Sequence, residues 1–140
     1  MPLPQPHDLT SLVLRTHFGD EGAWDALRAA VEGADEWSHA THVSDLRFAQ
    51  ADVRALVDEA AAAEEQVGIT HLFLADATAM DDPVHPLLAV DLWIEPGRTF
   101  RVPVRWFPAV SANLSLSNMD FAEYADLADG SGTFRGFGGD

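Results

Sequence analysis

Two carboxylates in this sequence lie in or beside apolar runs, where an unpaired charge is costly. Asp76 directly follows one such run and Asp91 lies inside another. An acid in this setting is held neutral, paired with Arg, or placed at a strand end that opens on a cleft. The two carboxylates are therefore candidate catalytic acid and base groups, or an anchor for a cationic substrate. The alternative, and the commoner outcome, is a structural ion pair with Arg15 or Arg105.

A third candidate catalytic residue, His85, lies between two prolines in a loop that also carries Asp81 and Asp82. A carboxylate could orient its imidazole, which could then shuttle protons. The sequence has no cysteine, and no serine stands in a nucleophile elbow, so it predicts no catalytic triad.

Arg15 and His17 end the first apolar run, directly before a predicted helix, and are candidate ligand-binding residues. A guanidinium at a strand-to-helix junction can hold a carboxylate or phosphate through two hydrogen bonds. The loop is not glycine-rich and contains no lysine, so it is not a phosphate loop. A structural Arg–Asp bridge is the alternative.

Polar side chains alternate with apolar ones between Asn113 and Asn118, which are the other two candidate ligand-binding residues. They could line one face of a strand and hydrogen-bond a ligand. Equally, they could cap turns and the following helix, a role that Asn118 suits best.

His39 and His42 are spaced by three residues, which on a helix would place both imidazoles on one face. The glutamate of a zinc-protease motif is missing, and the segment could equally form a short strand. We therefore expect no metal site and no cofactor, with these two histidines as the only weak metal candidates. Separately, Arg98, Arg101 and Arg105 predict a local basic strip on an otherwise acidic body.

Periodicity and turn residues predict the elements that must position these groups. We expect strands over 10–15, 69–75, 87–94, 99–106 and 110–117, with a short one at 41–43. We expect helices over 21–32, 51–65 and 119–128. The segments 87–94 and 99–106 should form a hairpin around a type II turn, because Pro96 and Gly97 suit its central positions.

These elements predict the α/β class, with a single layer of four to five mixed strands packed by about three helices. Residues 1–9 should form a Pro-rich N-terminal arm, 10–137 one globular domain and 138–140 a tail. The first residues lack the features of a signal peptide and no run is long enough to span a membrane, so we expect a cytoplasmic protein.

All eight basic residues are arginine, and they face 23 acidic residues, giving a net charge of −15. This charge excludes nucleic acid and anionic membrane surfaces as partners and favours a basic protein. The oligomeric state is not predicted.

Four segments carry a family resemblance that spans nearly the whole chain. They are L-V-L-R-T-H-F at 12–18, L-F-L-A-D at 72–76, H-P-L-L-A-V-D-L at 85–92 and N-L-S…N-M-D-F at 113–121. In these segments the chain resembles an actinobacterial family of small acidic α/β proteins, a domain of unknown function. The resemblance implies a bacterial, cytoplasmic protein and no particular activity. Members usually carry Asp at the position of His17, which argues against a catalytic base there.

By elimination, the sequence favours a non-catalytic acidic binding or regulatory module, such as an immunity-like or accessory protein that engages a basic protein partner. The alternative is a small enzyme or small-molecule-binding protein, for example of a biosynthetic pathway. Its cleft would lie at the strand ends and use the Asp, His and Arg groups named above.

Overall fold

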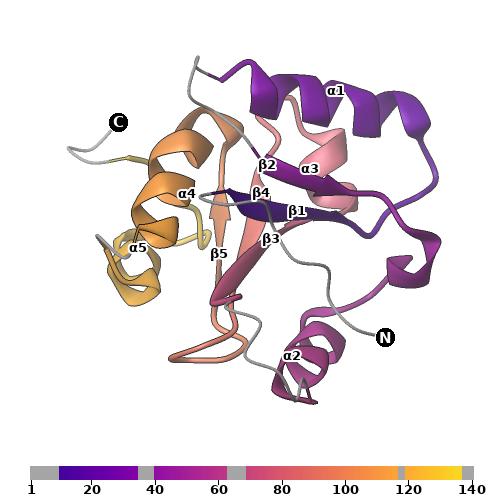
Figure 1. The fold of residues 1–140 in the computed structure, drawn as a ribbon. Coiled ribbons are helices and arrows are strands. Elements are labelled where there is room, and N and C mark those ends of the chain that lie inside the picture. Colours follow the sequence, from indigo (N-terminus) through magenta and orange to yellow (C-terminus); the bar gives the residue numbers. More distant parts are fainter. Residues whose placement is uncertain (1–9, 35–39, 63–68, 117–118, 137–140) are drawn as a thin grey trace.

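The computed structural model describes residues 10–34, 40–62, 69–116 and 119–136. These residues form one mixed sheet with helices on both faces, which confirms the α/β class (Figure 1). The strands in chain order are β1 (Ser11–Arg15), β2 (Ala40–Val43), β3 (His71–Ala75), β4 (Leu87–Asp91) and β5 (Thr99–Val102). The helices are α1 (Glu21–Glu32), α2 (Val53–Ala62), α3 (Ala77–Asp81), α4 (Phe107–Ser115) and α5 (Phe121–Leu127), with 3₁₀ turns at Leu46–Phe48 and Val104–Trp106.

The strand order of the sheet is β2-β1-β3-β4-β5. β1 pairs in parallel with β2 and β3, whereas β3–β4 and β4–β5 are antiparallel. We call the end of the sheet where β1, β2 and β3 finish the carboxyl edge, and the opposite end the amino edge. The central strands β1 and β3 are almost wholly buried, because helices cover both of their faces.

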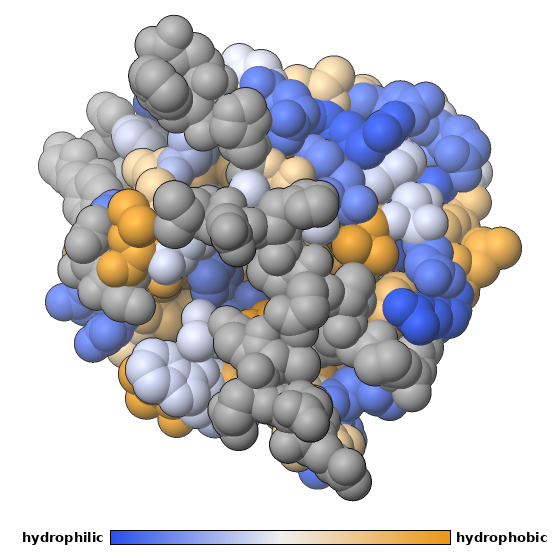
Figure 2. Space-filling model, viewed as in Figure 1, coloured by the Kyte–Doolittle hydropathy of each residue, from blue (hydrophilic) through white to orange (hydrophobic). Residues whose placement is uncertain are grey.

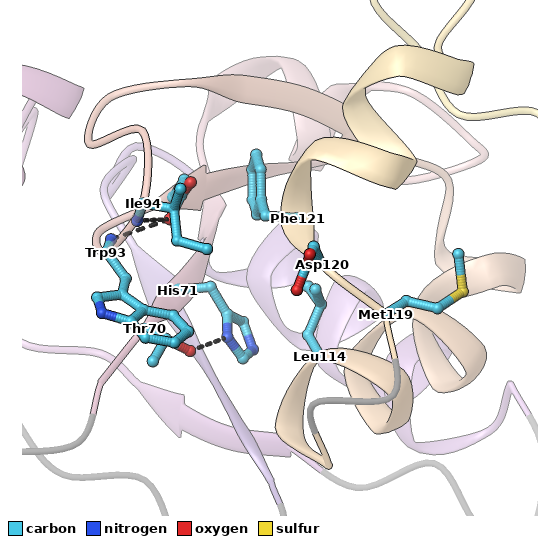
Figure 3. Close-up of a pocket in the computed structure, with 9 residues that line it drawn as sticks. Thr70, His71, Trp93, Ile94, Leu114, Met119, Asp120 and Phe121 are labelled. Carbon is cyan, nitrogen blue, oxygen red and sulfur yellow. Dashed lines mark hydrogen bonds between the residues drawn. The ribbon is translucent and has the colours of Figure 1, made fainter.

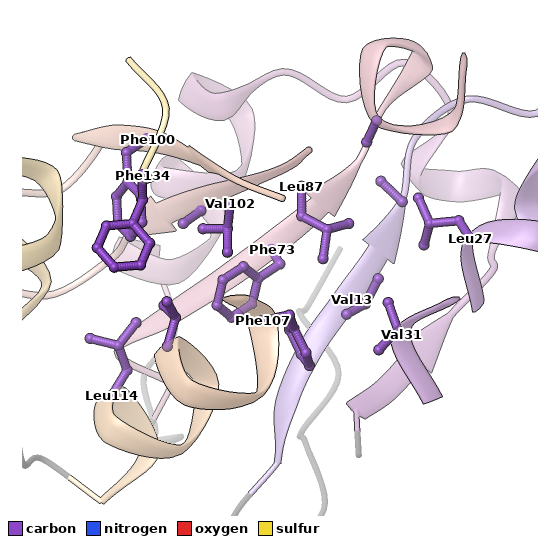
Figure 4. Close-up of a cluster of buried hydrophobic side chains, with 14 of the residues drawn as sticks. Val13, Leu27, Val31, Phe73, Leu87, Phe100, Val102, Phe107, Leu114 and Phe134 are labelled. Atoms are coloured by element: carbon purple, nitrogen blue, oxygen red, sulfur yellow. The ribbon is translucent and has the colours of Figure 1, made fainter. Parts of the chain in front are cut away.

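Alternate residues of the strands point to opposite faces of the sheet and make two cores. Val13 and Phe73 face α1, α3, α4 and α5, whereas Leu12 and Leu72 face α2 and the 3₁₀ turn before it. Figure 4 shows the larger core, in which side chains of α1 and α4 meet those of the strands. The helix that follows β1 and the helix that precedes β3 therefore lie on opposite faces.

Local signals explain the helices that agree with the sequence. Asp20 caps α1 by accepting a hydrogen bond from the Ala23 amide at 3.0 Å, and Trp24 lies on the buried stripe. Asp120 and Glu123 form a capping box at the start of α5. The β4–β5 hairpin is also confirmed, with Gly97 at φ 96°, as a type II turn requires.

The strand predicted over 110–117 is wrong, because residues 110–115 belong to helix α4. Phe107, Val110, Ser111 and Leu114 are all buried and follow a helical spacing. Pro108 lies in the first turn, where a proline fits without loss of a hydrogen bond. The alternating pattern led to a wrong prediction because the buried position 111 of the helix is filled by a serine, where an apolar residue is usual.

Other boundaries also differ from the prediction. The segment after β3 contains the short helix α3, where a loop was expected. The first hairpin strand, expected to reach residue 94, ends at Asp91, and the second ends at Val102. Pro103 follows directly and cannot donate to a ladder, so the chain turns into a 3₁₀ segment. In β2, His42 lies on a strand, so the helical spacing considered for it does not apply.

Some expectations fall outside the described residues. These are the arm at 1–9, the tail at 138–140, His39, Asn118 and the last turn predicted for the helix at 51–65. Within the described part of the chain, none of the helices has both the length and the apolar character needed to cross a membrane.

Candidate functional site

Asp76 lies at the carboxyl edge, between β3 and α3, and its carboxylate has two structural tasks. One oxygen accepts a hydrogen bond from the Ala79 amide at 3.0 Å and so caps α3. Both oxygens also pair with the guanidinium of Arg101, at 2.8 and 2.9 Å. The predicted ion pair therefore exists, but its partner is Arg101 and neither Arg15 nor Arg105.

Register explains this choice of partner. Leu74, Leu88 and Arg101 are aligned across β3, β4 and β5, so Arg101 lies in line with the end of β3. Arg15 instead projects to the face covered by α1, where its guanidinium lies 5.5 Å from the Trp24 ring.

His85 lies at the same edge, in the loop between α3 and β4, with φ of 46°. Its Nδ1 is 2.9 Å from the carbonyl oxygen of Ala79. Because a carbonyl can only accept, Nδ1 carries a proton and Nε2 is the basic nitrogen of the neutral ring. Arg101 also donates to the carbonyl of the next residue, Pro86, at 3.1 Å. The structure thus brings His85 and Asp76 to one edge, joined through Arg101.

Asp91 lies at the amino edge, away from the other catalytic candidates. It pairs in register with His71, the first residue of β3, whereas Asp76 follows the last. Five residues of strand separate these positions, about 16 Å. The Asp91 carboxylate is 2 % exposed and accepts the amides of Trp93, Ile94 and Glu95 at 2.9, 3.3 and 2.9 Å. The predicted Asp76–Asp91 pair therefore does not form one site.

The predicted ligand-binding residues also separate. Arg15 and His17 lie at the carboxyl edge, where the Thr16 amide donates to the Ala75 carbonyl. Asn113 is on α4 and donates to the Tyr124 hydroxyl at 2.8 Å, which ties α4 to α5. Burial raises the pKa of Tyr124, so the phenol stays protonated in this contact.

The basic strip predicted from three arginines is divided among local contacts. Arg98 pairs with Glu95 and Asp126, and hydrogen bonds to these two carboxylates raise its pKa. Arg105 lies on the 3₁₀ turn with its guanidinium 4.7 Å from the Trp106 ring. The other weak site residue, His42, bonds Glu32 at 3.0 Å, and no cluster of three metal-binding side chains occurs among the described residues.

A pocket at the amino edge includes Asp91, but its other lining residues were not among the candidate site residues predicted from the sequence. It is a cavity of about 120 Å³ between the β4–β5 hairpin and helices α4 and α5 (Figure 3). Its polar lining is Thr70, His71, Asp91 and Asp120, and its apolar lining is Trp93, Ile94, Leu114, Met119 and Phe121.

His71 anchors the floor of this pocket through a chain of hydroxyl groups. Its Nδ1 lies 3.0 Å from the Thr70 hydroxyl and its Nε2 lies 2.9 Å from the Ser11 hydroxyl. Ser11 in turn contacts Ser111 of α4 at 2.8 Å. Ser11 is buried, so this serine and histidine join α4 to the sheet and do not present a nucleophile to the pocket.

The mouth of the pocket carries two large apolar side chains in water. Trp93 is 64 % exposed and Ile94 is 56 % exposed, although they lie only two and three residues after the buried Asp91. On the face drawn in Figure 2, hydrophobic and hydrophilic residues are interspersed, and the area of the β4–β5 turn is mostly pale, because tryptophan is close to neutral on this hydropathy scale. The three hydrogen bonds from backbone amides to the Asp91 carboxylate hold this turn in one conformation.

Residues 10–137 match a family model described as a domain of unknown function, DUF6924. The match covers nearly the whole chain. The chain belongs to the DUF6924 family. No curated protein matches this chain. The resemblance seen in the sequence is confirmed at the level of the domain.

In this DUF6924 domain, sequence reasoning missed His71 although a signal was present. His71 and Ser11 are polar residues at the starts of two apolar strands. Had β1 and β3 been recognised as parallel neighbours, their starts would have been placed together at the amino edge.

The DUF6924 domain should lose stability in mild acid because of His71. Burial lowers the pKa of His71 from 6.5 to about 4, although Asp91 acts in the opposite direction. Between these values the unfolded chain binds a proton that the folded chain does not, so stability falls as pH drops from 6.5 to 4. The loss is up to about 3 kcal/mol.

Urea unfolding at several pH values measures this loss. The His71→Gln variant should show a shallower fall than the wild type over the same range. Carboxylates titrate at the acid end in both proteins, so the difference isolates His71. Parallel profiles for the two proteins would contradict the assignment.

Proposed function

We propose that this protein is a non-catalytic binding module that engages a basic protein partner in the cytoplasm. The contact surface that we infer comprises Trp93, Ile94, Glu95, Met119 and Asp120, and we call it the hairpin-tip surface. The proposal rests on one observation, the rigid display of Trp93 and Ile94 in water at the mouth of a pocket.

The turn that carries the exposed Trp93 and Ile94 is held by specific backbone interactions. Asp91 accepts three backbone amides from the turn, and Gly97 supplies the left-handed conformation that closes it. Two consecutive exposed apolar side chains in a fixed conformation are typical of an interface core, because ordering them on binding costs little entropy.

Charge around the hairpin-tip surface favours a basic partner. Glu95 and Asp120 are exposed carboxylates beside the apolar pair. Arg98, which lies in the same turn, is paired with both Glu95 and Asp126. With a net charge of −15, the chain would attract a partner that carries positive residues around an apolar centre.

The positions of the acid–base candidates support binding over catalysis. Asp76 and Asp91 lie at opposite edges of the sheet, and the Asp91 carboxylate already accepts hydrogen bonds from backbone amides. A small-molecule site at the carboxyl edge is the alternative function. Arg15, a buried cation at that edge, favours this alternative as a second site.

Affinity capture from a lysate of its own cells tests the proposal when the bait is varied. The wild-type bait should enrich a basic protein, and a Trp93→Ser/Ile94→Ser bait should lose it. Leu46→Ser is a matched control, because Leu46 is 72 % exposed but lies on the 3₁₀ turn before α2. A capture that is equal with all three baits, or no enrichment with any of them, would contradict the proposal.

A further inference from the structure

The guanidinium of Arg15 is a buried cation whose hydrogen-bonding capacity is only partly used. The residue is 1 % exposed. Its Nε donates to the His17 carbonyl at 2.8 Å, and its Nη1 donates to the Ser44 hydroxyl at 3.2 Å. Its Nη2 is also buried and has no hydrogen-bond partner among the described residues. A buried charged donor without a partner is unusual and calls for an explanation.

The counter-ion of Arg15 is a surface residue. Glu21, the first residue of α1, places one carboxylate oxygen 2.8 Å from Nη1, while its side chain is 74 % exposed. The contact uses only one of the two terminal nitrogens, whereas an oxyanion can engage both in parallel. Because the Glu21 side chain is mostly in water, it can move away without disturbing the packing, provided that another anion takes its place beside the buried guanidinium.

The position of Arg15 in the fold is one where α/β proteins bind ligands. α1 leaves β1 on one face of the sheet, whereas the chain that leaves the neighbouring strand β2 continues through α2 on the other face. The carboxyl ends of β1 and β2 are therefore a switch point of the sheet, where a crevice can open between diverging connections. Arg15 is the last residue of β1, and its contact with Glu21 turns it toward the positive end of α1.

Aromatic rings fix the guanidinium in this place. The Arg15 Cζ lies 4.3 Å from the centre of the Phe18 ring and 5.5 Å from that of Trp24. Such stacking orders the cation before a ligand arrives. Two other carboxylates at this edge have partners of their own, since Asp20 caps α1 and Asp76 pairs with Arg101.

We propose that Arg15 is the anchor of an oxyanion site, which takes the carboxylate or phosphate group of a small-molecule ligand. Two oxygens of that group pair with Nη1 and Nη2, and Glu21 moves out into water. Glu21 thus forms the ion pair with Arg15 while no ligand is bound, in the place that the ligand's anionic group would take. The site is separate from the hairpin-tip surface and does not depend on the function proposed for it.

The test is a titration of the Glu21→Ala variant with acetate and with inorganic phosphate, each against chloride at equal ionic strength. The readout is the NMR signal of the Arg15 Nε–H. We expect at least tenfold tighter binding of one or both anions to the variant than to the wild type. The stronger of the two arms identifies the ligand group as carboxylate or phosphate.

Asp25→Ala is the matched control, because Asp25 is an exposed acid of α1 that pairs with Arg28 and does not touch Arg15. It removes the same charge and should leave anion binding at the wild-type level. Arg15→Lys in the Glu21→Ala background should abolish the gain, since an ammonium group cannot form the paired contact. Equal anion binding by Glu21→Ala and Asp25→Ala, or no anion-specific shift in either, would overturn the proposal.

Discussion

Replacing Asp91 with Ala should lower the free energy of unfolding by about 3 kcal/mol and disorder the β4–β5 turn. The carboxylate is buried and accepts three amides, from Trp93, Ile94 and Glu95. Charge-assisted hydrogen bonds of this kind are stronger than neutral ones, and no other group described in the turn replaces the lost acceptors. Urea unfolding measures the stability, and amide hydrogen exchange at residues 92–98 measures the order of the turn.

Asp91→Asn is the informative control for this effect. Its amide keeps one oxygen for Trp93 and Ile94 but turns an N–H group toward the Glu95 amide. The loss of stability should therefore be smaller than for Ala, and protection should fall mainly at Glu95. A loss below about 0.5 kcal/mol for Asp91→Ala would show that the carboxylate does not hold the hairpin tip.

Replacing Phe107 with Ala should cost about 3–5 kcal/mol of stability, the largest single loss that we expect in the domain. Phe107 is the first residue of α4, is fully buried, and meets the ring of Phe73 on β3 edge-on with centroids 4.9 Å apart. Truncation leaves a cavity between α4 and the sheet and removes an aromatic pair. The measurement is the urea midpoint at constant slope.

Phe107→Leu keeps most of the buried volume and should lose only about 1–2 kcal/mol. This variant remains measurable if the Ala variant is largely unfolded, since a domain of this size has only about 5–15 kcal/mol to lose. If both variants retained wild-type stability, α4 would not pack on the sheet as the structure describes.

Where a local signal and the burial pattern agree, the sequence was enough to predict the fold. Helix α1 has the bounds expected for it, because Asp20 caps its start and Trp24, Leu27 and Val31 make a single buried stripe. The hairpin was also predicted correctly, because Pro96 and Gly97 determine the turn type regardless of the rest of the fold.

Helix α4 shows where local reasoning fails. The same residues fit both an alternating and a helical pattern, and the difference depends on what lies beneath Ser111. That residue is buried because Ser11 of β1, 100 residues earlier in the chain, accepts it as a hydrogen-bond partner. A contact between residues so far apart in the sequence cannot be predicted from a local sequence pattern.

The candidate residues were well chosen individually, but their grouping depended on register. Asp76 and Asp91 lie in or beside apolar strand runs, as predicted, and both carboxylates have hydrogen-bond partners. Their separation follows from β4 running antiparallel to β3, so that Asp91 lies opposite the start of β3 and Asp76 follows its end. The sequence does not specify strand direction, so it could not show which of these groups meet.

Titration of the captured partner tests the binding account most directly. Calorimetry at two salt concentrations would compare the wild type, the Trp93→Ser/Ile94→Ser variant and the Leu46→Ser control. We predict that the double variant binds at least about 30-fold more weakly, equivalent to about 2 kcal/mol, while its stability is unchanged and Leu46→Ser binds normally. We also predict that higher salt weakens wild-type binding, because acidic residues rim the surface. Equal affinity of all three proteins for the partner would contradict the assignment of the hairpin tip.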